Sequence, residues 1–398
     1  MPDRPGAFVP PTYPYDRLAP LSAVAARLPG GAVDLSVGTP CDAPPPAVVE
    51  ALGSSGAERG YPSGTGSARL LDAARAWIGR RFSVDVERGE VAACIGTKEL
   101  VAGIPHWLRL RDPSRDTVLY PSVSYPTYAM GAALAGCRAV PVPQRADGAL
   151  DLGSIDPADA TRALCLWVNS PSNPTGALDD LGAAARWGRG RGVPVLSDEC
   201  YAEFTWDGPA RTILEHGMDG VLAVHSISKR SNCAGLRVGF YAGDAGLVAY
   251  LAELRRHAGF MVPGPVQLAA AVALEDDAHV VAQRERYRTR LERCAAALRA
   301  IGVPVDLPSG GFYLWVRAPL EETLGGAGDA AGAASDLAPA WRFSWELAAR
   351  GGALVSPGEL YGEDGAGHVR IAVVQPLERI ELVADRLAAA RAEPARSR

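Results

Sequence analysis

The spacing of hydrophobic and polar residues changes along the chain. Between about residues 45 and 265, short apolar runs alternate with helix-length segments such as Ser67–Phe82 and Leu178–Arg191. The apolar runs are candidate strands because they are short and bounded by turn-forming residues. This alternation predicts an α/β domain with a mostly parallel, seven-stranded sheet. The candidate strands are Val91–Ile95, Thr117–Tyr120, Ala139–Val142, Ala163–Val168, Val193–Ser197, Val221–Ser226 and Val238–Ala242.

After Pro265 the alternation of strands and helices ends. A long helical run, Val266–Ile301, is followed by short strands near Phe312–Val316 and Val369–Val373 and by a final helix. This order predicts a second, smaller α+β domain at the C-terminus. We expect the N-terminal segment around Val33–Val37 to complete it.

The predicted organisation therefore has three parts. Residues 1–44 form an N-terminal arm and a segment that joins the small domain, residues 45–265 form the large domain, and residues 266–398 form the small domain. Residues 1–30 are rich in proline and weakly periodic, which suits an extended arm lying across the body or a neighbouring subunit. The Gly- and Ala-rich stretch 323–339 is low in complexity and is expected to be a flexible insertion.

Composition limits the classes of partner. The 398 residues are 48% hydrophobic and 21% charged, which is enough to bury a large core. Gly, Arg or Asp breaks the longest apolar runs before the roughly 18 residues of a membrane span, and the N-terminus lacks an apolar signal core, so a cytoplasmic protein is expected. The net charge of −5, with both signs interspersed, argues against a nucleic-acid partner. The seven scattered cysteines argue against a disulfide framework and a metal site.

Lysine is almost absent from the chain. Of the 40 basic residues, only Lys98 and Lys229 are lysine, and the rest are arginine. Arginine supplies a fixed positive charge but cannot lose a proton to form an imine. A lysine that survives in such a chain is therefore a candidate for amine chemistry, although chance survival in an Arg-rich chain is the alternative for either one.

Several candidate ligand residues follow directly after predicted strands. In open α/β sheets, ligands bind at the carboxyl ends of the strands. Gly96, Thr97 and Lys98 follow the first strand and open a helix, where backbone amides and a hydroxyl can bind a phosphate. An ordinary helix cap is the alternative explanation for this tripeptide.

Two further motifs follow the fourth and fifth strands. In N-S-P-S-N-P-T-G, prolines and glycine fix the backbone and leave the amide of Asn173 free to donate. In S-D-E-C-Y, Asp198 can hold a pyridine nitrogen protonated, and Tyr201 can donate to a ring hydroxyl. A Pro/Gly loop and a helix cap remain the alternatives for Asn173 and Asp198.

The motif S-I-S-K follows the sixth strand and contains Lys229. Ser226, Ser228 and Arg237 can bind phosphate oxygens, with the arginine making a bidentate contact, while Lys229 lies beside them. The chain thus contains residues that can bind a phosphate, donors for a ring hydroxyl, a carboxylate for a pyridine nitrogen and a lysine that can form an imine. Each of these stands after a predicted strand. Their joint occurrence indicates one cofactor with a phosphate and a pyridine ring.

These motifs resemble the signature of class I/II aminotransferases of fold type I, from about residue 15 to residue 390. Within the class, the chain resembles actinobacterial succinyldiaminopimelate aminotransferases of lysine biosynthesis. The segments that carry this second resemblance are D-L-S-V-G-T-P, T-K-E-L-V-A, Y-P-T-Y, N-S-P-S-N-P-T-G, S-D-E-C-Y, H-S-I-S-K-R-S-N-C-A-G-L-R-V-G-F and H-A-G-F-M-V-P-G-P-V-Q.

The resemblance implies a role for each matching residue. The cofactor is pyridoxal 5'-phosphate, carried by Lys229 as a Schiff base, with Tyr125 stacked on its ring. Thr97 and Lys98 hold the phosphate, and Tyr61 reaches the phosphate of the partner subunit in a homodimer with shared active sites.

The resemblance also implies how the substrate is held. Gly38 and Asn173 line the substrate pocket, and Arg370 binds the α-carboxylate of the substrate. Tyr125 as a core residue and Arg370 as a surface charge at a strand edge remain alternatives.

The implied reaction is a two-step exchange of an amino group between an amino acid, with glutamate expected as donor, and a keto acid. N-succinyl-2-amino-6-oxopimelate is the keto acid that the closer resemblance implies. In this exchange Lys229 moves the proton between the substrate α-carbon and the cofactor.

The chain departs from the closer subgroup at a few positions. Thr97 stands where relatives commonly have serine, and Cys233 and Leu236 are unusual in the lysine loop. A paralogue of secondary metabolism acting on another amino acid therefore remains an alternative, as does a carbon–sulfur lyase on the same fold. A DNA-binding regulator needs an N-terminal helix-turn-helix, which residues 1–30 do not provide.

Overall fold

The larger part of the molecule is built on a seven-stranded sheet. The computed structural model describes residues 8–53, 56–321, 323–324 and 337–392, and no helix in these ranges is long and apolar enough to cross a membrane. The strand order is β2-β8-β7-β6-β5-β3-β4, and only β8 runs antiparallel to its neighbours. The prediction of a mostly parallel, seven-stranded α/β sheet is confirmed. The strands are β2 (Val91–Cys94), β3 (Thr117–Pro121), β4 (Arg138–Val142), β5 (Ala163–Asn169), β6 (Val195–Asp198), β7 (Val221–Ser226) and β8 (Gly239–Gly243).

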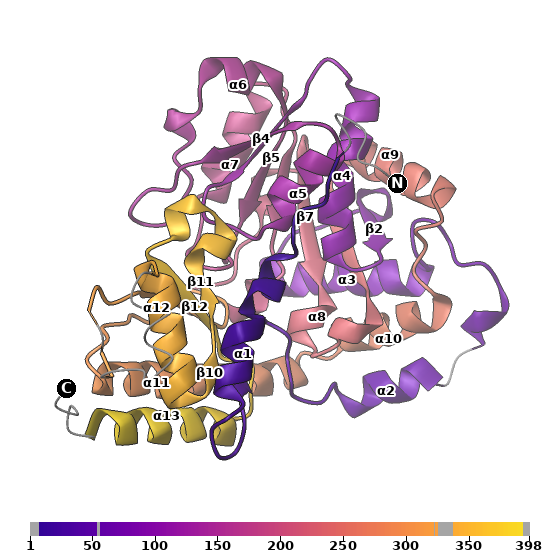
Figure 1. The fold of residues 1–398 in the computed structure, drawn as a ribbon. Helices are drawn as coiled ribbons and strands as arrows, with labels where there is room; N and C mark the ends of the chain where they lie inside the picture. The colour runs from indigo at the N-terminus through magenta and orange to yellow at the C-terminus, as the bar shows by residue number, and fades with distance from the viewer. Residues whose placement is uncertain (1–7, 54–55, 322, 325–336, 393–398) are drawn as a thin grey trace, which may run out of the picture.

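Helices cover both faces of this sheet (Figure 1). Successive residues of a strand point to opposite faces, so Leu222 and Val224 of β7 pack in one apolar layer and Val221 and Ala223 in the other. Both layers bury apolar side chains, which explains why the strands are continuously hydrophobic. The first layer lies under α4 (Thr97–Arg111), α5 (Thr127–Leu134) and α9 (Ala245–His257), and the second under α2 (Pro46–Gly53), α3 (Ala68–Phe82), α7 (Leu181–Arg189) and α10 (Gly264–Glu275). Two further helices are short: α6 (Pro157–Arg162) precedes β5, and α8 (Ile227–Arg230) follows β7.

The predicted helical run Val266–Ile301 is two helices, so the prediction of one helix was wrong. α10 ends at Glu275 and α11 (Ala278–Ala300) begins after Asp276 and Asp277. The Asp276 carboxylate accepts a hydrogen bond from the Ala278 N–H at 2.8 Å and so favours a new helix start. Because α10 packs in the core of the large sheet, its position favours a domain boundary near Asp276. The division at residue 265 remains a prediction.

The smaller part contains two small sheets. An antiparallel sheet has the order β11-β12-β9, and β1 pairs with β10 in parallel. Val33 and Leu35 lie in the core of this part, and the assignment of the N-terminal segment to a small domain stays a prediction. Residues 325–336 of the Gly/Ala-rich stretch lie outside the described residues. The elements are β1 (Val33–Asp34), β9 (Tyr313–Arg317), β10 (Ala353–Leu354), β11 (Ser356–Pro357), β12 (His368–Ala372), α11, α12 (Pro339–Glu346) and α13 (Leu377–Ala392).

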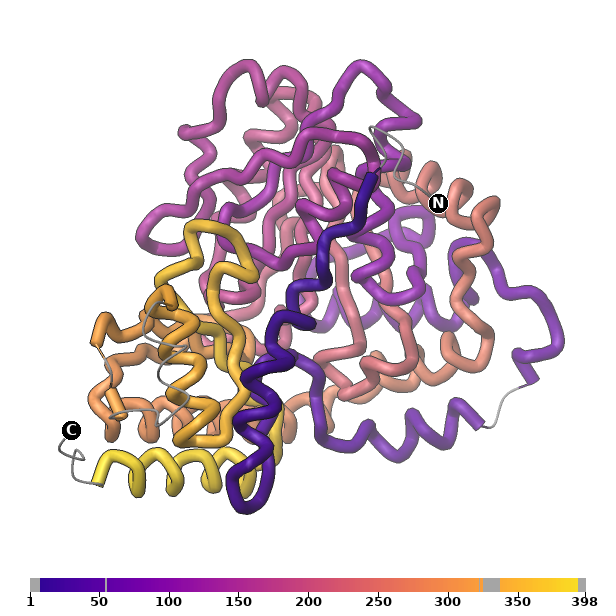
Figure 2. The backbone as a smooth tube through the Cα atoms, in the orientation of Figure 1, coloured from indigo at the N-terminus to yellow at the C-terminus, as the bar shows by residue number. Residues whose placement is uncertain are grey.

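The N-terminal arm crosses the molecule from the small sheets toward α5 and α4 (Figure 2). The arm is not extended throughout, because a 3-10 turn (Pro14–Leu18) and α1 (Ala19–Ala25) form within it. Each of these elements has a proline in its first turn, where a missing N–H costs nothing. Leu18 and Leu21 are buried against the small part, which places the residues just before them beside the sheet edge that carries the candidate ligands.

Candidate active site

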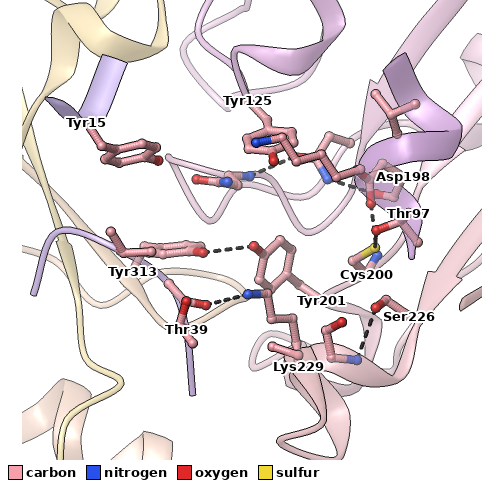
Figure 3. Close-up of a pocket in the computed structure, with 18 of the residues that line it drawn as sticks. Tyr15, Thr39, Thr97, Tyr125, Asp198, Cys200, Tyr201, Ser226, Lys229 and Tyr313 are labelled. Atoms are coloured by element: carbon pink, nitrogen blue, oxygen red, sulfur yellow. Dashed lines mark hydrogen bonds between the residues drawn. The ribbon is translucent and has the colours of Figure 1, made fainter. Parts of the chain in front are cut away.

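The carboxyl ends of β5, β6 and β7 border a cavity of about 460 Å³ (Figure 3). Residues from the start of α4, from the N-terminal arm and from β12 complete its lining. All but one of the residues predicted from the sequence meet there, and Tyr61 is the exception. The residues that line the cavity as expected are Gly38, Thr97, Lys98, Tyr125, Asn173, Asp198, Tyr201, Ser226, Ser228, Lys229, Arg237 and Arg370.

One end of the cavity is suited to a phosphate group. Gly96 has φ 74°, a backbone conformation that favours glycine, and a Cβ placed on it would lie 2.3 Å from the Arg237 guanidinium, so a larger residue would push Arg237 away. This close approach puts Arg237 beside the first turn of α4, where backbone N–H groups lack helical partners. Ser226 and Ser228 line the same cavity, with the Ser228 N–H donating to the Ser226 Oγ at 3.0 Å. A helix start, a guanidinium and hydroxyls form an anion site.

The Lys98 side chain contacts the N-terminal arm. Its Nζ donates to the Tyr13 hydroxyl at 3.1 Å and lies 4.8 Å from the centre of the Tyr13 ring. Burial disfavours the charge, but the Tyr125 and Tyr13 hydroxyls outweigh burial and raise the pKa of Lys98. The side chain is therefore a cation at the arm, while the backbone of the same residue lies in the first turn of α4. Its predicted contact with the phosphate stays a prediction.

Asp198 ends β6 and is buried. Its Oδ2 accepts from the Tyr128 hydroxyl at 2.9 Å, and its Oδ1 accepts from the Cys200 N–H at 3.2 Å. Burial raises the pKa of Asp198, against the effect of these donors. Neither partner carries a positive charge, although a buried carboxylate normally needs one. A protonated ring nitrogen is a fitting partner for this carboxylate.

The loop after β5 is tied to the strand that carries Asp198. The Asn173 N–H donates to the Asn169 Oδ1 at 2.7 Å, and the Asn169 Nδ2 donates to the Asp198 carbonyl at 2.8 Å. These bonds hold the loop in one conformation, as its prolines and glycine predict. They place the Asn173 side chain in the cavity, where its Oδ1 accepts from Arg370 at 2.8 Å.

Lys229 lies in α8, immediately after β7. Its Nζ donates to the Gly38 carbonyl. Burial lowers the pKa of Lys229 to about 8, and the Arg370 and Arg237 charges act in the same direction. The amine can therefore exist in both protonation states near neutral pH, as a nucleophile and a proton-transfer group require.

Arg370 is a buried cation held between tyrosine rings. It comes from β12 and is 1% exposed, and its guanidinium carbon lies 4.3 Å from the centre of the Tyr313 ring, 4.7 Å from that of Tyr361 and 6.0 Å from that of Tyr15. Burial opposes the charge, but the surrounding tyrosines raise the pKa of Arg370. Its hydrogen-bond acceptors are the Asn173 side chain and the Ser36 carbonyl, which are neutral. A substrate carboxylate can supply the missing negative charge.

Residues 31–387 match the family model described as aminotransferase class I and II. The chain is a class I/II aminotransferase. It is 42% identical to "Probable aminotransferase Rv1178" of Mycobacterium tuberculosis, covering 95% of this chain and 85% of that protein. It is 40% identical to 4-dedimethylamino-4-oxo-anhydrotetracycline transaminase OxyQ of Streptomyces rimosus, covering 95% and 99%. A solved structure described as a probable N-succinyldiaminopimelate aminotransferase of Thermus thermophilus has a TM-score of 0.80 at 29% identity, covering 94% and 99%.

The family establishes a fold type I enzyme that depends on pyridoxal 5'-phosphate, and the cavity of this aminotransferase fits that cofactor. Among the described residues no cation pairs directly with the buried Asp198, the glycine at position 96 lets Arg237 approach the start of α4, and Lys229 has a lowered pKa. These features match a ring nitrogen, a phosphate and an aldehyde respectively. Within the described ranges, no group of three or more His, Cys, Asp or Glu side chains could hold a metal ion.

Several residues of this site were not predicted from the sequence. Tyr128 is fully buried, stacks on Trp167 with ring centroids 5.1 Å apart and holds Asp198, and the second tyrosine of Y-P-T-Y is the signal that could have found it. Tyr313 lies in a hydrophobic strand and looks like a core residue. Tyr13 and Tyr15 lie in an arm whose pattern gives no sign of a contact with the cavity.

Tyr61 lies outside the cavity of its own chain. Its side chain is 99% exposed, just after the 3-10 turn Ala57–Arg59. Its predicted contact with the phosphate of a partner subunit stays a prediction.

Proposed function

We propose that this aminotransferase transfers an amino group from glutamate to a keto acid that carries a second anionic group, and that N-succinyl-2-amino-6-oxopimelate is such a substrate. The observation that carries the proposal is a pair of cations with neutral partners: Arg370 among tyrosine rings and Lys98 beside the Tyr13 phenol. One anion of the substrate pairs with each. The relative described as a probable N-succinyldiaminopimelate aminotransferase supports this substrate class.

In the proposed complex the cofactor is held by groups from the large sheet. Asp198 binds the ring nitrogen, and Asn173 and Tyr201 donate to the ring oxygen. Tyr125 covers the ring. The phosphate is bound by Thr97, the backbone N–H of Lys98, Ser226, Ser228 and Arg237, which leaves the Lys98 side chain free for the substrate.

Arg370 binds the substrate carboxylate, and Gly38 lines the pocket beside the substrate. Lys229 takes the proton from the substrate α-carbon and delivers a proton to the cofactor. When bound, pyridoxal phosphate supplies an electron sink that makes this α-proton acidic. Lys229 suits this task because a pKa of about 8 lets its amine lose and regain a proton near neutral pH.

A half-reaction screen tests the substrate class. Enzyme whose cofactor is in the pyridoxamine form is mixed separately with N-succinyl-2-amino-6-oxopimelate, 2-oxoglutarate or pyruvate. The rate of the cofactor absorbance change is measured for each. We expect both acids with a second anion to react faster than pyruvate, and Lys98→Gln to raise the apparent KM for them about tenfold without affecting pyruvate. Pyruvate reacting as fast as the other two refutes the proposal.

A second candidate substrate is an oxo group on a polycyclic secondary metabolite. The 40% identity to OxyQ over 99% of its length favours this second candidate. Because OxyQ is described as a transaminase, the same similarity supports transamination over the carbon–sulfur lyase reaction. A ketone without a carboxylate does not need Arg370. Turnover of 4-dedimethylamino-4-oxo-anhydrotetracycline that survives Arg370→Gln in the half-reaction therefore distinguishes this candidate.

We also infer a homodimer in which Tyr61 of each chain completes the partner's site, since its side chain is exposed and lies outside the cavity of its own chain. A Tyr61→Phe chain and a Lys229→Ala chain, each impaired alone, should regain activity when mixed. The restored site takes Lys229 from the first chain and Tyr61 from the second. Sedimentation that shows an active monomer, or no gain of activity after subunit exchange, contradicts the shared site.

A further inference from the structure

Tyr313 touches three residues of the candidate site. Its hydroxyl lies 2.8 Å from the Tyr201 hydroxyl, and its ring centre lies 4.3 Å from the Arg370 guanidinium carbon (Figure 3). A Cβ on Gly38 would fall 2.1 Å from the same hydroxyl, so a side chain at position 38 would displace Tyr313. Tyr313 is 1% exposed and is therefore fixed in this position.

The hydrogen-bonding capacity of Tyr201 fixes the direction of the contact between the two tyrosines. A phenol has one proton to donate and lone pairs to accept. If Tyr201 donates its proton to the cofactor ring oxygen, it can only accept from Tyr313. Tyr313 then donates to Tyr201, and a chain of two hydrogen bonds leads from Tyr313 to the ring oxygen.

We propose that Tyr313 is a positioning residue with two separable actions: its hydroxyl strengthens the hydrogen bond that Tyr201 gives to the cofactor ring oxygen, and its ring orients Arg370 for the substrate carboxylate. Hydrogen bonds in a chain polarise one another, so a donor to Tyr201 makes Tyr201 a stronger donor. The inference rests on the proposed role of Tyr201.

The charge of Arg370 supports the first action. The guanidinium favours the ionised form of Tyr313 and so acts to lower the pKa of this phenol, although burial is the larger effect and raises the pKa to about 12. A phenol next to a cation is a better donor than one in an apolar core. The other titratable groups that act on the two tyrosines are Cys200, Tyr15 and Tyr125, which stay unchanged in the variants below.

Two variants of Tyr313 separate the two actions. Tyr313→Phe removes the hydroxyl and keeps the ring, and Tyr313→Leu removes both. For Tyr313→Phe, the pH midpoint of the bound cofactor's absorbance change should rise by up to about half a pH unit, because a weaker donor favours protonation of the cofactor. The KM for carboxylate substrates should stay unchanged in this variant.

Tyr313→Leu should show the same absorbance shift and also raise the KM for carboxylate substrates about tenfold, because the loss of the aromatic face releases Arg370. The control is Tyr361→Phe. This change also removes a hydroxyl above Arg370, but that hydroxyl pairs with Tyr15 at 3.1 Å and not with Tyr201, so the absorbance midpoint should not move. Thermal melting of each holoenzyme shows that the variants are folded.

A third variant, Tyr201→Phe, distinguishes a failure of the proposed role of Tyr201 from a failure of the proposed role of Tyr313. Tyr201→Phe should raise the absorbance midpoint by about one pH unit or more. No shift in Tyr201→Phe overturns the proposed role of Tyr201 itself. A shift in Tyr201→Phe without one in Tyr313→Phe overturns the action of the Tyr313 hydroxyl, and an unchanged KM in Tyr313→Leu overturns the action of the ring.

Discussion

The two sides of the active-site cavity are built in different ways. The cofactor side, which we define as Asp198, Ser226, Lys229 and Arg237, comes from one edge of the large sheet. Asp198 and Ser226 end the neighbouring strands β6 and β7, Lys229 follows β7, and Arg237 stands just before the antiparallel β8. The carboxylate side, defined as Arg370 and its tyrosines 15, 313 and 361, comes from segments far apart in the chain. Tyr15 and Tyr361, whose hydroxyls meet, are 346 positions apart.

This difference separates the cofactor chemistry of the enzyme from its choice of substrate. Sheet topology fixes the cofactor side, because the carboxyl ends of parallel strands meet at one edge. Packing between the arm, the small sheets and the loop of Asn173 fixes the carboxylate side. A change in the arm can therefore alter the substrate that is accepted and leave the cofactor groups in place.

The largest effect is expected on the cofactor side, at Lys229. Lys229→Ala should lower turnover about ten thousandfold, because proton transfer at the α-carbon loses its base. Lys98→Arg is the matched control, since Lys98 is the one other lysine of the sequence. Borohydride reduction followed by peptide mapping should find the cofactor on the peptide with residue 229 in the wild type and in Lys98→Arg. Label on residue 98 contradicts the assignment.

Arg370→Gln tests the carboxylate side alone. Loss of a buried, charge-assisted pair costs about 4 kcal/mol, so kcat/KM for carboxylate substrates should fall roughly a thousandfold. Arg370→Lys should recover part of this loss, because it keeps the charge without the fork. The absorbance of the bound cofactor should stay that of the wild type. If Arg370→Gln releases the cofactor, the two sides are not independent.

Asp198→Asn returns to the cofactor side and keeps the shape of the side chain. Turnover should fall at least about a hundredfold, because the ring nitrogen loses the charge that keeps it protonated. The cofactor should remain bound, which equilibrium dialysis measures. Near-native turnover in this variant reduces Asp198 to a structural cap.

The sequence predicted the two sides unequally, for the same physical reason. Asp198, Lys229 and the N-S-P-S-N-P-T-G loop are short motifs after strands, so a strand prediction alone brings them together. Tyr313 and Tyr15 meet Arg370 through tertiary packing, which no local pattern encodes. Tyr128 falls between these cases, because it stands in a recognised motif but acts from the buried face of α5.

The fold was predictable to a similar extent. The seven strands and their mostly parallel arrangement follow from short apolar runs between helices. The break at Asp276 was missed because apolar periodicity continues on both sides of it, and the new helix is marked by the Asp276 carboxylate, which accepts from the Ala278 N–H. The helices in the arm were missed because prolines suggested an extended chain, although both stand in first turns.

The pKa of Lys229 gives a smaller, pH-dependent effect. The pKa of Lys229 is near 8 in the folded apoprotein and has the ordinary value of 10.5 in the unfolded chain. Below pH 8 the amine is charged in both states, and burying this charge lowers the stability of the fold by its full amount. This loss of stability shrinks as the pH rises above 8 and is gone above pH 10.5. Apo Lys229→Met should therefore be more stable than wild-type apoprotein by about 2 kcal/mol at pH 7, with a smaller difference at pH 10. Urea unfolding at the two pH values measures this. A difference that grows with pH contradicts the lowered pKa.

The smallest effect is expected at Tyr128, and it shows whether the support of the cofactor side reaches beyond the strand ends. Tyr128→Phe removes one hydrogen bond of 2.9 Å to Asp198 and keeps the ring on Trp167. A bond of this kind contributes about 1 kcal/mol, so kcat should fall about fivefold with KM unchanged. The Cys200 N–H still donates to the carboxylate, which is why the loss stays far below that of Asp198→Asn. Tyr128→Phe combined with Asp198→Asn should be no slower than Asp198→Asn alone, because the phenol acts through the carboxylate. Additive losses in this cycle place Tyr128 in an independent role, such as packing α5 on the sheet.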